Sequence, residues 1–176
     1  FWRKDVFQDA GLDPEKPPEN WDELLEFARK IADPARGKYG ISMATGAQSS
    51  WDFLPYVWAA GGEAVVQDPN GEWRAAFGSR EAAVALEFYL RLAMEPWRDS
   101  DGTLQYGYST LNADVRSVRY ALQSGKLGMY AGYLSDNTMG GGQDPNLLGI
   151  APFPVGPSGK SATEINTELY TIFAGI

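Results

Sequence analysis

The chain has 176 residues, 44% of them hydrophobic, so it can bury the core of one domain. Its 15 basic and 23 acidic residues give a formal charge of -8, which disfavours a phosphate backbone, and we expect no nucleic-acid partner. It has no Cys and no His, which excludes disulfides, Ser-His-Asp and Cys-His nucleophiles, and zinc sites built from those ligands.

Two helices are predicted near the start of the chain. The stretch FWRKDVFQDAGL predicts a strand end or loop followed by a short helix that closes at Gly11. NWDELLEFARKIADP is a stronger helix signal, because Asn20 is a good N-cap and Glu23 is its capping-box partner. Pro34 ends this second helix. The residues of its apolar stripe are Leu24, Phe27, Ala28 and Ile31.

Strand and helix signals then alternate. KYGISMATG predicts a buried strand, and EAVVQDPNGEWRAAF predicts a hairpin whose turn runs from Asp68 to Gly71. Ser79 is the expected cap of a long helix, SREAAVALEFYLRLAM, which a polar, tyrosine-bearing loop follows. The apolar residues that share one face of this helix are Ala83, Leu86, Leu90 and Ala93.

The last part of the chain completes the pattern. DVRSVRYALQSG predicts a helix that ends at Gly125, KLGMYAG and NLLGIAPFP predict strands, and PVGPSGKSAT predicts an exposed loop. Strands that alternate with helices indicate a layered α/β domain. The chain begins at Phe1 rather than Met and stops within the strand-like run LYTIFAGI, so we expect a piece of a longer protein.

The stretch SSWDFLPYVWAAGGE gathers four aromatic residues before a double glycine. Because proline disfavours helical geometry in the residue before it, we expect a helix that starts near Pro55 and runs through Ala60. Trp51 and Phe53 then lie in a strand-to-helix loop, where open α/β sheets line their ligand crevice. Trp51 is either a core or lid aromatic or a stacking surface for a ring-shaped ligand. The residues expected to pack inward are Leu54, Val57 and Trp58.

In their order and spacing, these motifs resemble the extracellular solute-binding proteins that feed ABC importers of sugars, the group to which maltodextrin-binding proteins belong. FWRKDVFQDAGLDP is similar to the opening of the family's second lobe, and NWDELLEFARKI is similar to the helix that follows it. KYGISM, the aromatic-Pro-aromatic helix, LQSGKLGMY and GIAPFPVGPSGKSAT follow in the family's order. The resemblance implies an α/β lobe of the type II periplasmic-binding-protein-like fold, with a central mixed sheet flanked by helices. Residues 1–176 would be a single lobe, the C-terminal one, excised from a two-lobed protein.

The resemblance also implies a ligand site. Ser49, Ser50 and Trp51 fall where family members place ligand contacts, including a stacking aromatic just ahead of the Pro-containing helix. The bound molecule would be a sugar or oligosaccharide in the cleft between two lobes, delivered to the transmembrane subunits of an ABC permease. The family implies an extracellular, periplasmic or lipid-anchored lipoprotein location, with membrane association only through a tether outside this chain.

Two later positions depart from the family pattern. Where family members carry a stacking Trp, this sequence aligns either Tyr133 or Ser135, and only the tyrosine would preserve stacking. Asp136 nearby is either an acceptor for ligand hydroxyls or a turn residue. Glu168 stands near the position of a family aromatic, and it is either a solvated strand-end residue or a group that holds hydroxyls, an amine or a cation.

Other functions remain open from the residues alone. Glu164 with Glu168 would suit a cationic solute such as a polyamine or peptide, and the same fold can serve a sensor. A carboxylate-based glycoside hydrolase needs an acid pair about 5 to 9.5 Å apart, which no sequence spacing establishes. Its candidate acids are Asp52, Glu63, Asp136, Glu164 and Glu168. DPNG and GGGQDPN lack the carboxylate spacing of a calcium loop, so we interpret both as turns and expect no metal. We also expect no cofactor.

Overall fold

A computed structural model describes residues 1–46, 49–112, 115–132 and 145–164 of the protein. Its helices are α1 (Lys4–Asp9), α2 (Trp21–Ile31), α3 (Ser49–Ala59), α4 (Arg80–Met94) and α5 (Val115–Gln123), with 3-10 turns η1 (Pro34–Arg36) and η3 (Pro145–Leu147). Its strands are β1 (Trp2–Arg3), β2 (Tyr39–Ala44), β3 (Val65–Gln67), β4 (Trp73–Ala75), β5 (Pro96–Arg98), β6 (Leu104–Tyr106), β7 (Ser109–Asn112), β8 (Leu127–Met129) and β9 (Leu148–Gly149). The predicted α/β class is confirmed.

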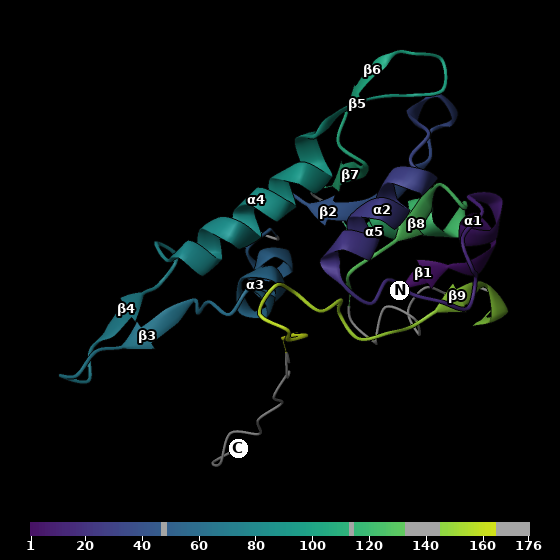
Figure 1. The fold of residues 1–176 in the computed structure, drawn as a ribbon. Coiled ribbons are helices and arrows are strands. Elements are labelled where there is room, and N and C mark those ends of the chain that lie inside the picture. Colours follow the sequence, from purple (N-terminus) through teal and green to yellow (C-terminus); the bar gives the residue numbers. More distant parts are fainter. Residues whose placement is uncertain (47–48, 113–114, 133–144, 165–176) are drawn as a thin grey trace, which may run out of the picture.

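The main sheet is mixed. Within the described residues its strand order is β7-β2-β8-β1-β9 (Figure 1). β2 runs parallel to both neighbours, pairing Ile41 with Ser109 of β7 and with Met129 of β8. β1 runs antiparallel to β8 and β9. The hairpins β3–β4 and β5–β6 form separate two-stranded sheets.

Helices cover both faces of this sheet. Gly128 of β8 faces α2 so closely that a Cβ there would press into the Ile31 side chain. Successive strand residues point to opposite faces, so the neighbouring Leu127 points away from α2. Leu127 is fully buried and packs with Val118 and Leu122 of α5. The predicted arrangement, a central sheet flanked by helices, is therefore confirmed.

An aromatic cluster joins α3 and α4 to α2. The Trp21 ring stacks on Phe88 with centroids 4.5 Å apart, and Tyr56 lies tilted against Trp21 at 5.7 Å. All three side chains belong to the buried core. Tyr56 also meets the Phe153 ring edge-on at 4.8 Å, which attaches the segment after β9 to the same core.

Local capping chemistry starts two helices where the sequence predicts. Asn20 Oδ1 accepts a hydrogen bond from the Glu23 backbone N–H at 3.0 Å, and Ser79 Oγ accepts one from Ala82 N–H at 3.1 Å. The Glu23 carboxylate accepts from the N–H of Glu19 at 2.9 Å, whereas a regular capping box would have it accept from the N–H of Asn20. Side-chain caps thus fix both starts.

The start of α3 was predicted wrongly. The helix begins at Ser49, so Trp51 and Phe53 lie inside it rather than in a preceding loop, and Pro55 is its seventh residue. Proline there removes one backbone hydrogen bond. Burial of Pro55 with the following Tyr56 and Val57 opposes that loss. Of the residues expected to point inward, Val57 is fully buried, while Leu54 and Trp58 are half-buried.

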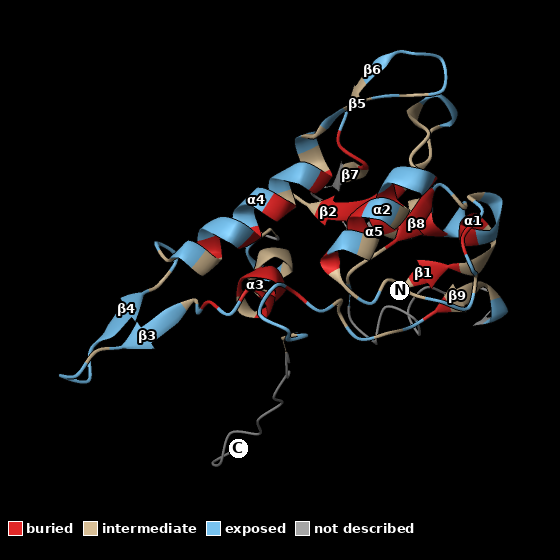
Figure 2. Ribbon diagram, viewed as in Figure 1, coloured by how far each residue is buried: buried red, intermediate tan, exposed pale blue. Residues whose placement is uncertain are grey.

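The apolar face predicted for α4 is mostly its outer face (Figure 2). Leu86 is 47% exposed, Leu90 is 44% exposed and Ala83 is exposed, whereas Ala93 is half-buried against the core. The inward face of the helix carries Ala82, Ala85, Phe88 and Leu92. Both faces of α4 are apolar, so helical periodicity alone did not identify the buried one.

Two further segments differ from the prediction. The expected polar loop after α4 contains the β5–β6 hairpin and then β7, an edge strand of the main sheet. Conversely, only Leu148–Gly149 of the predicted strand NLLGIAPFP is extended in the sheet. The β3–β4 hairpin and its turn are confirmed, with Asp68 Oδ1 accepting from the N–H groups of Asn70 and Glu72.

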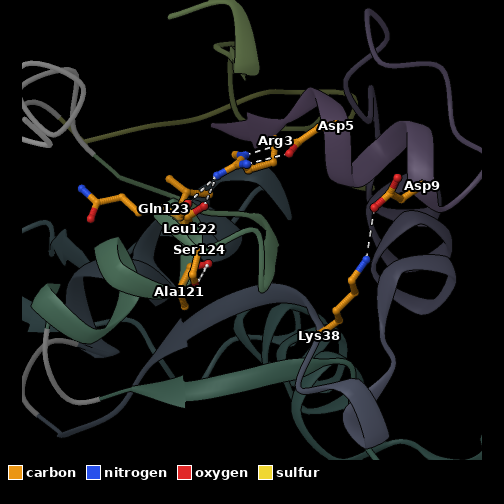
Figure 3. Close-up of polar contacts among 8 residues, drawn as sticks. All are labelled: Arg3, Asp5, Asp9, Lys38, Ala121, Leu122, Gln123 and Ser124. Atoms are coloured by element: carbon orange, nitrogen blue, oxygen red, sulfur yellow. Dashed lines mark hydrogen bonds and ion pairs between the residues drawn. The ribbon is translucent and has the colours of Figure 1, made fainter. Parts of the chain in front are cut away.

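Arg3 of β1 ties the sheet to the end of α5 (Figure 3). Its buried guanidinium donates from Nη1 to the carbonyl oxygens of Leu122 at 2.5 Å and Gln123 at 3.0 Å. Nε and Nη2 donate to the Asp5 carboxylate at 2.8 and 2.6 Å. The guanidinium therefore satisfies carbonyls that a helix end leaves open and complements the helix dipole. Hydrogen bonding from Arg3 holds the pKa of Asp5 below its usual value.

We expect Arg3→Met to lower the free energy of unfolding by about 2 kcal/mol at neutral pH, because charged hydrogen bonds are lost in a buried site. Asp5 has a lowered pKa in the folded state, so its stabilisation is present at neutral pH and is lost as the pH falls through that pKa. The difference in the free energy of unfolding between Arg3→Met and the parent should therefore become smaller in acid. Urea unfolding at several pH values measures this difference. Arg36→Met, at a side chain 80% exposed, is the matched control, and equal losses in the two variants would contradict the assignment.

Candidate functional site

The candidate site lies at one edge of the main sheet. Because β2, β7 and β8 are parallel, their carboxyl ends, at Ala44, Asn112 and Met129, point to the same edge. α3 begins at Ser49, shortly after β2 ends. Ligands of open α/β sheets bind outside this edge, so the first turn of α3 is in the expected position.

The first turn of α3 carries the predicted contacts Ser49, Ser50 and Trp51. Ser50 is exposed, and Ser49 Oγ donates to the Gly46 carbonyl at 2.7 Å. Trp51 is 47% exposed, although the later residues Tyr56 and Val57 of the same helix are buried. The three predicted residues thus form the first turn of α3, and the Trp51 ring is partly accessible.

Asp52 attaches this turn to the end of β2. Its Oδ2 accepts a hydrogen bond from the backbone N–H of Ala44 at 3.2 Å. The Tyr89 hydroxyl of α4 makes a long contact of 3.5 Å with the carbonyl oxygen of the same residue, Ala44. The Phe53 and Tyr89 rings meet edge-on at 5.4 Å. Side chains of two helices therefore contact both backbone polar groups of Ala44.

The phenols beneath the site are neutral. Burial raises the pKa of Tyr56 well above its usual value, and the neighbouring Tyr89 and the negative charge of Asp52 raise it further. The pKa of Tyr89 is also raised, first by burial and then by Asp52. Tyr56 of α3 and Tyr89 of α4 therefore contribute aromatic packing and neutral hydroxyl groups near the start of α3, and neither carries a phenolate charge at neutral pH.

Tyr130 is a second aromatic residue at this edge, and it was predicted only as part of the strand KLGMYAG. It follows directly after β8, and its ring stacks on Phe1 with centroids 6.2 Å apart and planes at 22°. Its backbone N–H donates to the Phe1 carbonyl at 2.9 Å. Sequence alone did not reveal this pair because it depends on β1 lying beside β8.

The remaining predicted site residues cannot be placed in this geometry. Tyr133, Ser135, Asp136 and Glu168 lie outside the residues that the structure describes, so their roles stay predictions. In the part of the chain that is described, no cluster of three His, Cys, Asp or Glu residues could hold a metal ion. None of the helices in the described ranges has the length and apolar character of a membrane span.

Comparison with known proteins places the chain in a family. Residues 1–175 match the sequence profile of the bacterial extracellular solute-binding protein family. The chain belongs to this family. The sequence-based resemblance is confirmed, and the family is one of binding proteins of ABC transporters rather than enzymes.

Two curated relatives in the family match nearly the whole chain. A Brucella abortus (strain 2308) protein is 29% identical over 98% of this chain and 39% of its own length. YcjN of Escherichia coli (strain K12), named as an ABC transporter periplasmic-binding protein, is 26% identical over 100% of this chain and 35% of its own length. The chain therefore spans less than two-fifths of the curated relatives that it matches here.

Solved structures in the family share the fold. Maltose-bound MalE3 of T. maritima has a TM-score of 0.70 at 27% sequence identity. The match covers 92% of this chain and 39% of the MalE3 chain. The cyclic alpha-maltosyl-1,6-maltose binding protein of Arthrobacter globiformis has a TM-score of 0.66 at 28% identity, covering 91% of this chain and 37% of its own. These neighbours are type II periplasmic binding proteins, which confirms the predicted fold class.

Proposed function

We propose that residues 1–176 form one lobe of a two-lobed solute-binding protein that holds a sugar or oligosaccharide at the carboxyl edge of the main sheet. The observation that carries this proposal is the Trp51 ring, 47% exposed in the first turn of α3 at that edge. An aromatic face stacks on the apolar face of a sugar ring, while nearby polar groups fix its hydroxyls. Ser49 and Ser50 provide such groups.

The solved neighbours support a carbohydrate ligand. One has maltose bound, another is a binding protein for cyclic alpha-maltosyl-1,6-maltose, and a third, from Thermotoga lettingae, has alpha-D-tagatose bound, the last at 30% identity and a TM-score of 0.59. In our proposal, closure of two lobes buries the ligand, and the closed protein delivers it to the transmembrane subunits of an ABC permease. The protein would work on the outer side of the cytoplasmic membrane, in the periplasm or on a lipid anchor, as its family implies.

We expect Trp51→Ala to weaken binding of the preferred sugar about 30-fold, the ~2 kcal/mol of a central aromatic contact. Isothermal titration calorimetry of the complete protein against a panel of mono- and oligosaccharides measures the Kd. Trp73→Ala is the matched control, because Trp73 is 69% exposed on the β3–β4 hairpin and should leave the Kd unchanged.

A different result would change the ligand class. If no sugar binds and polyamines or basic peptides do, the carbohydrate proposal is wrong and a cationic solute replaces it, with Glu164 and Glu168 as the residues to test next. If a sugar binds but Trp51→Ala leaves its Kd unchanged, the ligand is a carbohydrate and the assigned stacking residue is wrong.

A further inference from the structure

The first turn of α3 is weakly held by its own helix. In a regular helix the N–H of residue 55 would donate to the carbonyl of residue 51, but Pro55 has no N–H. The first turn of α3, residues 49–51, therefore lacks one of the hydrogen bonds that would join it to the rest of the helix. A turn in this position needs another attachment if a side chain on it is to keep one orientation.

Asp52 makes that attachment. Its Oδ2 accepts from Ala44 N–H at 3.2 Å, which connects the start of α3 to the last residue of β2. β2 lies inside the main sheet, and Ala44 at its end is paired with Asn112 of β7, so the main sheet holds Ala44 in place. The influence of the Asp52 charge on the pKa values of Tyr56 and Tyr89 agrees with a carboxylate directed toward the buried side of α3.

The attachment determines where the neighbouring ring points. Consecutive residues of an α-helix are about 100° apart around its axis. With the Asp52 side chain held against β2, the side chain of Trp51 is turned away from the sheet interior and remains 47% exposed. If the hydrogen bond between Asp52 and Ala44 were lost, the first turn of α3 could rotate or fray, and the Trp51 ring would sample several orientations.

We propose that Asp52 is a positioning residue, which orients the exposed Trp51 ring at the carboxyl edge of the main sheet by accepting a hydrogen bond from the end of β2. Its effect on ligand affinity rests on the function proposed above, whereas its effect on the ring does not. An aromatic platform held in its bound orientation avoids the cost of ordering when the ligand arrives. Asp52 would therefore raise affinity without touching the ligand.

The orientation of the ring is measured by 19F NMR of the complete protein labelled with 5-fluorotryptophan. The Trp51 resonance is the one that disappears in Trp51→Phe. We expect Asp52→Ala to shift and broaden this resonance and to leave that of Trp73 unchanged. Asp52→Asn keeps an oxygen that can accept from Ala44 N–H, so it should restore the parent spectrum.

The affinity for the preferred sugar is then measured in the same variants. We expect Asp52→Ala to raise the Kd about 10-fold and Asp52→Asn to stay within about 3-fold of the parent. An unchanged Trp51 resonance in Asp52→Ala overturns the positioning role whatever the affinity, and so does a failure of Asp52→Asn to restore it. If the resonance responds as expected but no sugar binds, the positioning role stands and the proposed function fails. If a sugar binds with a Kd that does not depend on Trp51, the carbohydrate ligand stands and the stacking role of Trp51 is wrong.

Discussion

Replacing Gly40 by Ala should lower the free energy of unfolding by about 3 kcal/mol, at the upper end of the usual cost of overpacking. Gly40 lies in β2 under α2, where an added Cβ would overlap the carbonyl oxygen and Cα of Ala28. These are backbone atoms in the middle of a helix, so they cannot rotate aside as a flexible side chain would. Either α2 must lift from the sheet or β2 must bend, and both elements bury core residues.

Gly78→Ala is the matched control for this substitution. Gly78 precedes the Ser79 cap of α4, has no neighbouring atoms within 4 Å of an added Cβ and does not have a positive φ. The same methyl group should there be neutral or should stabilise by up to about 1 kcal/mol, because alanine restricts the unfolded chain. Urea unfolding followed by circular dichroism compares the two variants with the parent. A Gly40→Ala protein as stable as the parent would show that α2 is not held as close to β2 as the structure indicates.

Features that depend on a few neighbouring residues were predictable from the sequence. The caps at Asn20 and Ser79 and the turn after Asp68 all use a side chain and a backbone group two to four residues apart. Such interactions form in the same way whatever surrounds them. The existence and order of α2, β2, α4 and β8 followed from the same local signals and from hydrophobic periodicity.

Features that depend on distant partners were not predictable. The rule that proline starts a helix misplaced α3, because Asp52 bonds Ala44 and the residues after Pro55 are buried by other elements. β7 was missed because the short segment Ser109–Asn112 becomes a strand only by pairing with β2. In each case tertiary contacts outweighed the local preference.

The candidate site also contains residues that the sequence pointed to and one residue whose role it did not reveal. Ser49, Ser50 and Trp51 were predicted as ligand contacts from an aromatic stretch and a family resemblance, and they form the first turn of α3, shortly after β2 ends. Their contact with a ligand stays a prediction. The role of Asp52 was not visible, because its bond to Ala44 requires a helix that starts at Ser49. From the sequence, Asp52 was one acid among several candidates for a glycosidase.

The helix α4 offers the clearest test of which contacts stabilise the fold, because it places two leucines on opposite faces. Leu92 is fully buried in the core, and Leu90 is 44% exposed on the outer face. We expect Leu92→Ala to lower the free energy of unfolding by about 3 kcal/mol, since it removes buried methyl groups and leaves a cavity. Leu90→Ala should cost less than about 1 kcal/mol.

The two substitutions are matched in every other respect. Both replace leucine by alanine in the interior of α4, so the change in helix propensity is the same small amount and cancels in the comparison. The difference between them, measured by urea unfolding, therefore reports burial alone. If Leu90→Ala cost as much as Leu92→Ala, the outer face of α4 would have to be covered in the folded protein, and the apolar stripe of Ala83, Leu86 and Leu90 would be part of a buried contact after all.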